Sequence, residues 1–379
     1  MPAAGHRVIQ HGICLQDPAH FMTRSCAVVK GGLMRFLKFG IITVVVAAII
    51  LLIVLFRPTR REATFFPMGG IPFKVVAYGR TMLAFDKDMI AVKKRVAELE
   101  ALFDRLSDVS ELNRLNHDAA VAPFRMSAEM GRIMALSRKW YRDSDGAFDP
   151  SIGPLVDLWK SAAKLGHLPS EHVISSARNR VGLDKISQVG ADAIFFSRDG
   201  MGLDFGAIAK GLIDDEAAKV LQSRRVARGV VDAGGNALAF GEGRFSFGIQ
   251  DPTASRRGQL MAKVDVPAGA VITSGNYERY VEINGERYSH IIDPRTGRPA
   301  ENGLISATVI GGNGADADAL ATAIMVLGRE KGIELLKRLG NFEAVLVEKT
   351  PQGFEAWISS SLDGKIVFTP PWADKVHSM

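Results

Sequence analysis

The sequence predicts an α+β protein: a single large domain of mainly antiparallel sheet and packed helices, preceded by one N-terminal transmembrane helix. Three observations carry this prediction. Residues 39–56 contain no charged side chain. Short apolar runs separated by turn residues fill much of the chain from residue 229 onward, which is typical of antiparallel strands. Amphipathic helical repeats occur in groups instead of alternating with the strands.

The uncharged run "FGIITVVVAAIILLIVLF" comes first along the chain. A helix of this length spans roughly 27 Å, close to the thickness of a bilayer core. We therefore expect a transmembrane anchor over 36–57, followed by one domain over 58–379. Residues 1–35 are expected to be an N-terminal extension, because Met22 and Met34 are alternative starts. No small-residue cleavage pattern follows the run, which favours an uncleaved anchor.

The basic charge of the chain is concentrated at this end. The first 61 residues hold eight Lys and Arg side chains against Asp17 alone, a balance of +7, whereas the whole chain carries +6. The remainder is therefore near −1, so its composition does not indicate a nucleic-acid partner. Both cysteines, Cys14 and Cys26, precede the apolar run. The predicted domain consequently has no disulfide framework and no cysteine metal site.

The sequence of the first half of the domain predicts strands and two helices. The run "TFFPMGGIPFKVVAYG" has strand-like apolar residues on both sides of a Met-Gly-Gly bend. The run "DMIAVKKRVAELEALFDRLS", over 88–107, repeats apolar residues at helical spacing opposite a charged face. The run "MSAEMGRIMALSRKWYRDSDG" predicts a second helix that Ser127 caps and Gly146 ends.

The second half predicts a series of strands and then two helices. Strand patterns separated by turns occur in "GVVDAGGNALAFG", "RFSFGIQDP", "VDVPAGAVITSG" and "RYVEING". Helices are expected over 315–327 and 330–339, and further strands near Ala344 and Ile366. Nothing in the composition divides this region into separate domains.

The run "GADADALATAIMVLG" suggests a metal site. Asp318 and Thr322 are four residues apart, so in a helix their side chains lie on one face. A carboxylate and a hydroxyl are hard oxygen ligands that suit Mg²⁺. The competing interpretation is that Asp316 or Asp318 caps the helix and Thr322 has no special role.

Other runs have weaker signals for ligand binding. In "LDFGAIAKG", Lys210 stands between glycines at the start of a helix pattern, where backbone N–H groups favour phosphate. In "VITSG", Thr273 and Ser274 are possible phosphate donors. In "GAFDPSIGPLVDLW", Phe148 beside Asp149 would suit a flat ring. A structural turn explains "LDFGAIAKG" and "VITSG" equally well. A place in the hydrophobic core explains Phe148 equally well.

Together these segments resemble one known family, the FAD:protein FMN transferases or ApbE family. The resemblance covers roughly residues 68–327, in chain order. It is carried by "MGG", "SELNRLN", "GAFDPSIGPLVDLW", "LDFGAIAKG", "VVDAGGNALAFG", "ITSGNYERY", "YSHIIDPRTGRP" and "ADALATAIMVLG". It implies an ApbE-type, T-fold-like domain. It also implies a transferase that uses Mg²⁺ to move FMN from FAD to a Thr or Ser hydroxyl of a partner protein, through a phosphoester bond, with release of AMP.

The resemblance also implies the roles of individual residues. His290 stands where the family has its reactive histidine, and we interpret it as the base that takes the acceptor's proton. The competing interpretation is a histidine that orients Asp293 or its turn. The implied metal ligands are the side chains of Asp318 and Thr322 and the backbone carbonyl of Ala207. The implied FAD contacts are Met68, Ala147, Phe148, Asp149, Asp204, Lys210 and Ile292.

One segment departs from the family pattern, and two other activities stay open. The run "LSDVSELNRLN" lacks the family's Tyr, so one contact to the flavin ring is unassigned. The same site would serve a membrane-anchored FAD pyrophosphatase or a non-catalytic flavin carrier. The resemblance suggests acceptors such as subunits of Na⁺-pumping quinone reductase or Rnf. We therefore expect a single-pass protein of the cytoplasmic membrane, with its catalytic domain on the periplasmic side.

Overall fold

The computed structural model describes residues 39–54, 57–256, 258–277 and 280–379. Residues 39–54 are helical. Among the described residues, no helix has both the length and the apolar character needed to cross a membrane. The predicted anchor over 36–57 includes residues that lie outside the described set, and the predicted extension 1–35, with Cys14 and Cys26, lies wholly outside it.

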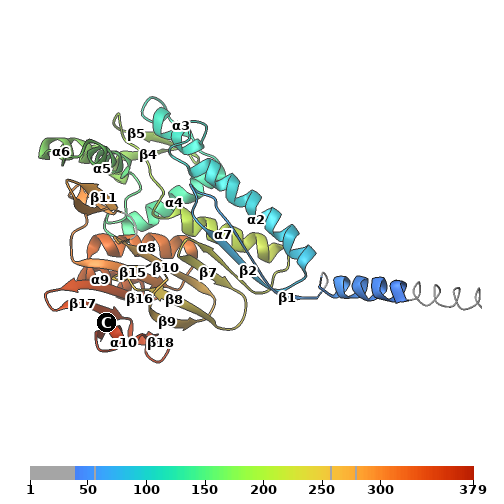
Figure 1. The fold of residues 1–379 in the computed structure, drawn as a ribbon. Helices are drawn as coiled ribbons and strands as arrows, with labels where there is room; N and C mark the ends of the chain where they lie inside the picture. The colour runs from blue at the N-terminus through green and yellow to red at the C-terminus, as the bar shows by residue number, and fades with distance from the viewer. Residues whose placement is uncertain (1–38, 55–56, 257, 278–279) are drawn as a thin grey trace, which may run out of the picture. The chain divides into compact units, whose positions relative to one another are not determined.

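A nine-stranded sheet forms the centre of the compact unit Pro58–Met379. Its strands lie in the order β1-β2-β6-β7-β10-β15-β16-β17-β19 (Figure 1). All neighbouring pairs are antiparallel except β17 and β19, which confirms the predicted mainly antiparallel sheet. The strands are β1 Thr59–Phe65, β2 Phe73–Arg80, β6 Gly229–Ala233, β7 Asn236–Phe240, β10 Gly269–Gly275, β15 Leu304–Ile310, β16 Glu343–Thr350, β17 Gly353–Ile358 and β19 Val376–Ser378.

Side chains alternate between the two faces of this sheet, so a single strand contributes to two cores. In β10, Ile272 belongs to the main core and its neighbour Val271 to a second core on the other face. Their cross-strand partners in β15, Val309 and Ile310, divide in the same way. Burial on both faces explains why these strands appear in the sequence as nearly continuous apolar runs.

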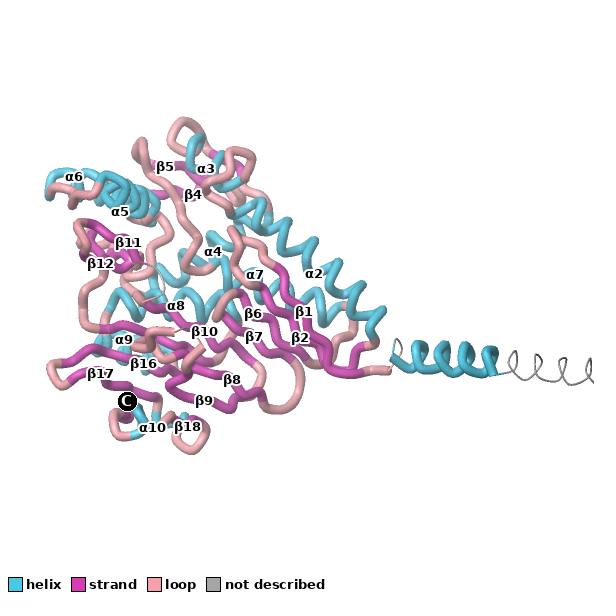
Figure 2. The backbone as a smooth tube through the Cα atoms, in the orientation of Figure 1, coloured by secondary structure: helices cyan, strands magenta, loops and turns pink. Residues whose placement is uncertain are grey.

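Helices cover one face of the sheet, and a small three-stranded sheet covers the other (Figures 1 and 2). On the helical face, α7 (Ala209–Ser223) and α8 (Gly314–Leu327) contact the strands, and α2 (Met82–Phe103) packs on α7. The remaining helices of this layer are α4 (Ala128–Asp143) and α9 (Arg329–Leu339). The opposite face carries β8 (Phe245–Gln250), β9 (Leu260–Val266), β18 (Ile366–Phe368), η2 (Ser360–Leu362) and α10 (Pro370–Ala373).

Two glycines allow α7 and α8 to approach closely. A Cβ atom on Gly211 would lie 2.0 Å from the carbonyl oxygen of Gly314, and a Cβ atom on Gly314 would lie 2.3 Å from that of Gly211. Any side chain at either position would force the helices apart. This contact holds the first turn of α7 against α8, which brings Lys210 next to Asp318.

A third core lies at the end of the unit where the shorter elements gather (Figure 2). It joins Leu155 and Trp159 of α5 to Ile174 of α6, Ile283 of β11 and Ile292 of β13. The elements around this core are α5 Gly153–Leu165, α6 Glu171–Arg178, β11 Tyr280–Ile283, β12 Glu286–Ser289, β13 Ile292–Asp293 and β14 Arg298–Pro299. Five further short elements contribute their apolar side chains to the main core instead: α3 Glu111–Asp118, β3 Phe124–Arg125, η1 Leu183–Lys185, β4 Ile186–Val189 and β5 Ala193–Phe196.

The predicted elements are present, with shifted ends. The helix expected over 88–107 begins earlier, because Thr81 caps it by accepting a hydrogen bond from the backbone N–H of Ala84 at 3.2 Å. Ser127 caps α4 as predicted, and accepts from the N–H of Met130 at 3.2 Å. The sequence patterns did not predict α3, α5 and α6. Helices α3 and α6 are short, and α5 begins with a glycine followed by a proline.

Candidate active site

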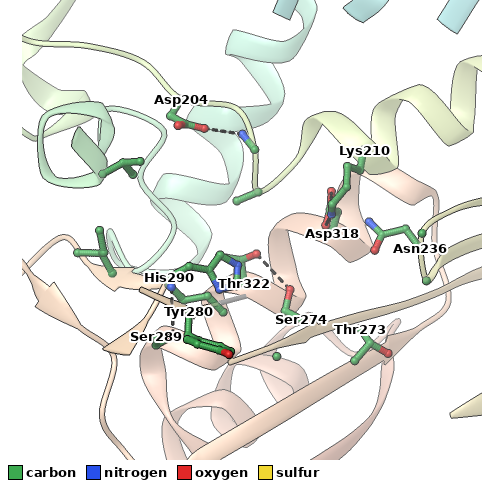
Figure 3. A pocket seen from close by; sticks show the side chains of 18 of the residues that line it. Asp204, Lys210, Asn236, Thr273, Ser274, Tyr280, Ser289, His290, Asp318 and Thr322 are labelled. Atoms are coloured by element: carbon green, nitrogen blue, oxygen red, sulfur yellow. Dashed lines mark hydrogen bonds and ion pairs between the residues drawn. The ribbon is translucent and has the colours of Figure 1, made fainter. Parts of the chain in front are cut away.

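One cavity of about 660 Å³ gathers most of the predicted site residues. Its wall includes residues of α5, α7, α8, β10 and the β11–β12 hairpin, and Figure 3 shows it from close by. Of the eleven predicted residues, nine line it: Phe148, Asp149, Asp204, Ala207, Lys210, His290, Ile292, Asp318 and Thr322. Segments far apart in the sequence thus meet at one place.

Lys210 and Asp318 form an ion pair at the wall of this cavity (Figure 3). The ammonium of Lys210 lies 3.1 Å from Oδ1 of Asp318, and the backbone N–H of Gly211 donates to Oδ2 at 3.1 Å. Asp318 is 1 % exposed and stands one turn inside α8. Asn313 caps the helix instead, accepting from the N–H of Asp316 at 2.8 Å. The interpretation of either aspartate as the cap is therefore wrong.

A second buried acid, Asp214, belongs to the same corner. It is fully buried, and within the described residues neither of its carboxylate oxygens has a hydrogen-bond partner. Burial raises the pKa of Asp214 well above its usual value, and the carboxylates of Asp232 and Asp318 raise it further, whereas Lys210 opposes them. Asp214 therefore adds a buried acidic group near the pair of Lys210 and Asp318. A cation bound near these carboxyl groups would offset their mutual repulsion.

The predicted metal ligands fit that need. Asp318 offers a carboxylate, Thr322 a hydroxyl and Ala207 a backbone carbonyl, and all three residues line the cavity. No group of three or more His, Cys, Asp or Glu side chains in the described part of the chain is arranged to hold a metal ion. A metal here would therefore depend on one carboxylate and several uncharged oxygens. Hard oxygen donors of this kind suit Mg²⁺.

The hydroxyls of "ITSG" lie in a strand and not in a turn. Thr273 and Ser274 both belong to β10 and both line the cavity. The Oγ of Ser274 lies 3.3 Å from the Oγ1 of Thr322, while the Oγ1 of Thr273 bonds with that of Thr308 at 2.8 Å. Ser274 is therefore placed to act with Thr322 on the same ligand group.

Two further acids line the cavity. The Oδ1 of Asp204 accepts from the N–H of Gly206 at 2.8 Å, which shapes the turn before α7. Burial raises the pKa of Asp149, although its Oδ1 accepts from both the N–H and the hydroxyl of Ser151, at 2.8 and 2.6 Å. These local bonds fix both carboxyl groups before any ligand arrives.

Apolar and aromatic side chains also line the cavity. Phe148 is 2 % exposed, so it belongs to the main core and also lines the cavity. Trp159 lines it too, and its indole N–H donates to the carbonyl of Gly297 at 2.9 Å. Sequence reasoning did not single out Trp159. Its signal was the helical spacing of α5, which puts it on the buried face with Leu155 and Ala162.

Met68 and Ala147 do not line the cavity. Met68 packs against the main core, has a φ of +51°, and donates its backbone N–H to Oε1 of Glu100 at 2.7 Å. Ala147 is 2 % exposed and lies within the main core. Ile71, three residues after Met68, does line the cavity. In the run that lacks the family's Tyr, Val109 is 84 % exposed and is not part of the wall.

His290 stands between β12 and β13 and reaches the cavity that Lys210 and Asp318 line (Figure 3). The alternative role for this histidine was to orient Asp293. The carboxylate of Asp293 accepts three bonds from Arg295, from its backbone N–H at 2.8 Å, Nε at 2.8 Å and Nη2 at 2.7 Å. Arg295 therefore holds this turn through its own bonds to Asp293.

Comparison with known proteins agrees with this architecture. The ApbE family matches residues 70–346, so the chain belongs to the ApbE family. It is 32 % identical over 286 residues to the FAD:protein FMN transferase of Salmonella typhimurium, which covers 70 % of this chain and 81 % of that protein. It is 30 % identical over 329 residues to the FAD:protein FMN transferase of Vibrio cholerae, covering 84 % and 96 %.

Solved structures show the same fold. The flavinyl transferase ApbE of Pseudomonas stutzeri, in its apo form, superposes with a TM-score of 0.69 at 29 % identity. That superposition covers 82 % of this chain and 98 % of the other. The α+β architecture expected from the family resemblance is thereby confirmed.

Proposed function

We propose that the chain is an Mg²⁺-dependent FAD:protein FMN transferase, which moves FMN from FAD to a Thr or Ser hydroxyl of an acceptor protein. The make-up of the cavity described above carries this proposal. Its aromatic lining residues, Phe148 and Trp159 among them, suit a flat ring system. Its polar lining residues, Lys210, Ser274 and Thr322 among them, suit a pyrophosphate. Membership of the ApbE family supports the same activity.

The proposed reaction exchanges one bond to phosphorus for another. The acceptor hydroxyl oxygen attacks the phosphorus on the FMN side of the pyrophosphate. The bond from that phosphorus to the bridging oxygen breaks, and its electron pair leaves with AMP. The hydroxyl proton has to be taken up as the new bond forms. His290 is the proposed acceptor of that proton, because a neutral imidazole is a suitable base near neutral pH.

The remaining polar residues of the cavity would bind and neutralise charge. Mg²⁺ held by Asp318, Thr322 and the carbonyl of Ala207 would neutralise the pyrophosphate as charge moves to the leaving group. Lys210, 3.1 Å from Asp318, would add a second positive charge on the same side. Asp204 and Asp149 are the proposed polar contacts along the rest of FAD.

The activity is tested with the full chain, FAD, Mg²⁺ and a purified FMN-binding acceptor domain that carries a Thr or Ser site. Covalent flavin on the acceptor, seen by in-gel fluorescence, together with one AMP per flavin would support the transferase. Free FMN and AMP without labelled protein would instead assign a pyrophosphatase, and unchanged FAD a carrier.

His290→Asn separates binding from transfer in the same assay. FAD affinity should stay near that of the wild type, because the proposed FAD contacts lie on other residues. The transfer rate should fall by about 10²–10⁴-fold, the usual contribution of a general base. Asn also forms local hydrogen bonds in turns. A variant that transfers FMN within a few-fold of the wild type would therefore leave His290 with a structural role only.

We also propose that residues 36–57 anchor the protein in the cytoplasmic membrane, with the catalytic domain on the periplasmic side. The support is the uncharged run 39–56 and the exposed apolar side chains along the helical residues 39–54. Subunits of membrane redox complexes such as Na⁺-pumping quinone reductase or Rnf are the proposed acceptors. Fusion of a reporter after Met379 tests the orientation, since strong activity of a cytoplasm-only reporter would contradict it.

A further inference from the structure

The motif "SELNRLN", residues 110–116, lies outside the cavity, because none of these described residues lines it. One of its asparagines, Asn116, nevertheless holds the segment that carries Asp204. We propose that Asn116 is a positioning residue for FAD binding, because its side-chain amide fixes the backbone of Leu203 and so sets the place of the Asp204 carboxylate. This inference rests on the proposed function, in which FAD is the ligand of Asp204.

Asn116 binds both backbone groups of Leu203. Its Nδ2 donates to the carbonyl of Leu203 at 2.9 Å, and its Oδ1 accepts from the N–H of Leu203 at 2.7 Å. The pairing imitates one step of a β-ladder. Leu203 is fully buried. If the amide were removed, a backbone donor and a backbone acceptor would lose their partners where water has little access.

The residues on either side of Leu203 are tied to a second wall of the cavity. The carbonyl of Gly202 accepts from the N–H of Gly153 at 3.2 Å, and the N–H of Asp204 donates to the carbonyl of Pro150 at 2.7 Å. Pro150 directly follows Asp149, which lines the cavity. The segment 202–204 is therefore held between the 149–153 segment on one side and Asn116 on the other. Loss of Asn116 would leave it fixed on one side only.

The other asparagine of the motif acts on the charge beside Asp204. The Nδ2 of Asn113 donates to the backbone carbonyl of Arg105 at 3.0 Å. The guanidinium of Arg105 binds both carboxylate oxygens of Asp157, at 2.9 and 2.8 Å, and its Nε lies 3.6 Å from Oδ2 of Asp204. The motif thus fixes the backbone next to Asp204 through Asn116, and it contacts the backbone of the neighbouring cation, Arg105, through Asn113.

The test measures FAD affinity of the full chain in detergent by quenching of flavin fluorescence. Asn116→Ala and Asn116→Asp should each bind FAD about tenfold more weakly or worse. Asp keeps an acceptor for the Leu203 N–H but places a second oxygen against the Leu203 carbonyl. Using two variants keeps the test valid if one of them folds poorly.

Asn302→Ala is the matched control. Asn302 also binds two backbone groups with its side-chain amide, donating to the carbonyl of Met325 at 2.9 Å and accepting from the N–H of Leu304 at 3.1 Å. It does not line the cavity. Asn302→Ala should lower the melting temperature as much as Asn116→Ala, while FAD affinity stays within about twofold. Equal losses of FAD affinity in both variants would overturn the proposal.

A double-mutant cycle with Asp204→Ala isolates the positioning effect. If Asn116 acts through Asp204, the loss of affinity caused by Asn116→Ala should be at least about threefold smaller in the Asp204→Ala background. The same loss in both backgrounds would overturn the proposal. Wild-type protein that fails to bind FAD would instead overturn the proposed function. Wild-type protein that binds FAD, with Asn116→Ala binding equally well, would overturn only the role of Asn116.

Discussion

Two faces of helix α7 carry similar charges for different purposes. On one face, Lys210 pairs with the buried Asp318, beside the carboxyl of Asp214, which has no hydrogen-bond partner among the described residues. On another face, at the middle of the helix, Glu216 contacts three cations. It accepts hydrogen bonds from Arg132, from Lys219 at 2.9 Å and from Arg95 at 2.8 Å. The Lys210 face has more acid than base, and the Glu216 face has more base than acid.

The difference appears in the pKa values of the carboxyl groups. Burial alone would raise the pKa of Glu216, but the hydrogen bonds from Arg132, Lys219 and Arg95 outweigh it and lower the pKa to about 2. On the other face, burial and neighbouring carboxylates both raise the pKa of Asp214. A satisfied cluster stabilises the fold, whereas an unsatisfied one has capacity left for a ligand. We infer that the first turn of α7 serves binding and that Glu216 serves stability.

The substitution Asp318→Ala is the strongest test of the proposed binding role of the Lys210 face. The variant loses the one carboxylate among the proposed metal ligands, so transfer should fall about 100-fold or more. The melting temperature should also fall by several degrees, because Lys210 and the N–H of Gly211 lose their buried partner. Transfer rate is measured against Mg²⁺ concentration, with melting followed by circular dichroism. Near-normal activity at low Mg²⁺ would contradict the metal assignment of α8.

Much of this architecture follows from local patterns in the sequence. The N-cap of α4 at Ser127 and the turn at Gly234 and Gly235 depend on neighbouring residues, and both were predictable. The C-cap of α4 is Ser144, two residues before the predicted end at Gly146. Period-two and period-3.6 apolar repeats likewise predicted the sheet and the long helices. The short helices α3, α5 and α6 were missed, because eight to thirteen residues give few repeats, and their stability comes from tertiary packing.

The site was predictable only where a family motif marks it. Spacing put Asp318 and Thr322 on one helix face, but it left open whether Asp318 was a cap. The structure answers that question, because Asn313 caps the helix by accepting a hydrogen bond from the N–H of Asp316. The pairing of Lys210 with Asp318 depends on the contact of Gly211 with Gly314 across two distant helices. No local pattern encodes such a contact, and the same holds for Asn116 and Leu203.

The last prediction concerns the Glu216 face of α7, where a substitution should not change the activity. In Glu216→Gln the carboxylate is lost but its shape is kept, leaving Arg95, Arg132 and Lys219 without their shared partner. The side chain of Glu216 is only 11 % exposed, so these contacts are weakly screened.

The effect of this substitution should depend on pH. The pKa of Glu216 in the folded protein, about 2, lies below the ordinary value of 4.5. Its contribution to stability is therefore full above pH 4.5 and is lost as the pH falls toward 2. At pH 7 the variant should melt about 2–6 °C below the wild type. At pH 3 the gap should narrow, because the wild type has by then lost part of the contribution. FAD affinity and transfer rate should stay within about twofold. A variant that melts at the same temperature as the wild type at pH 7, or that binds FAD tenfold more weakly, would show that the two faces of α7 do not divide their roles in this way.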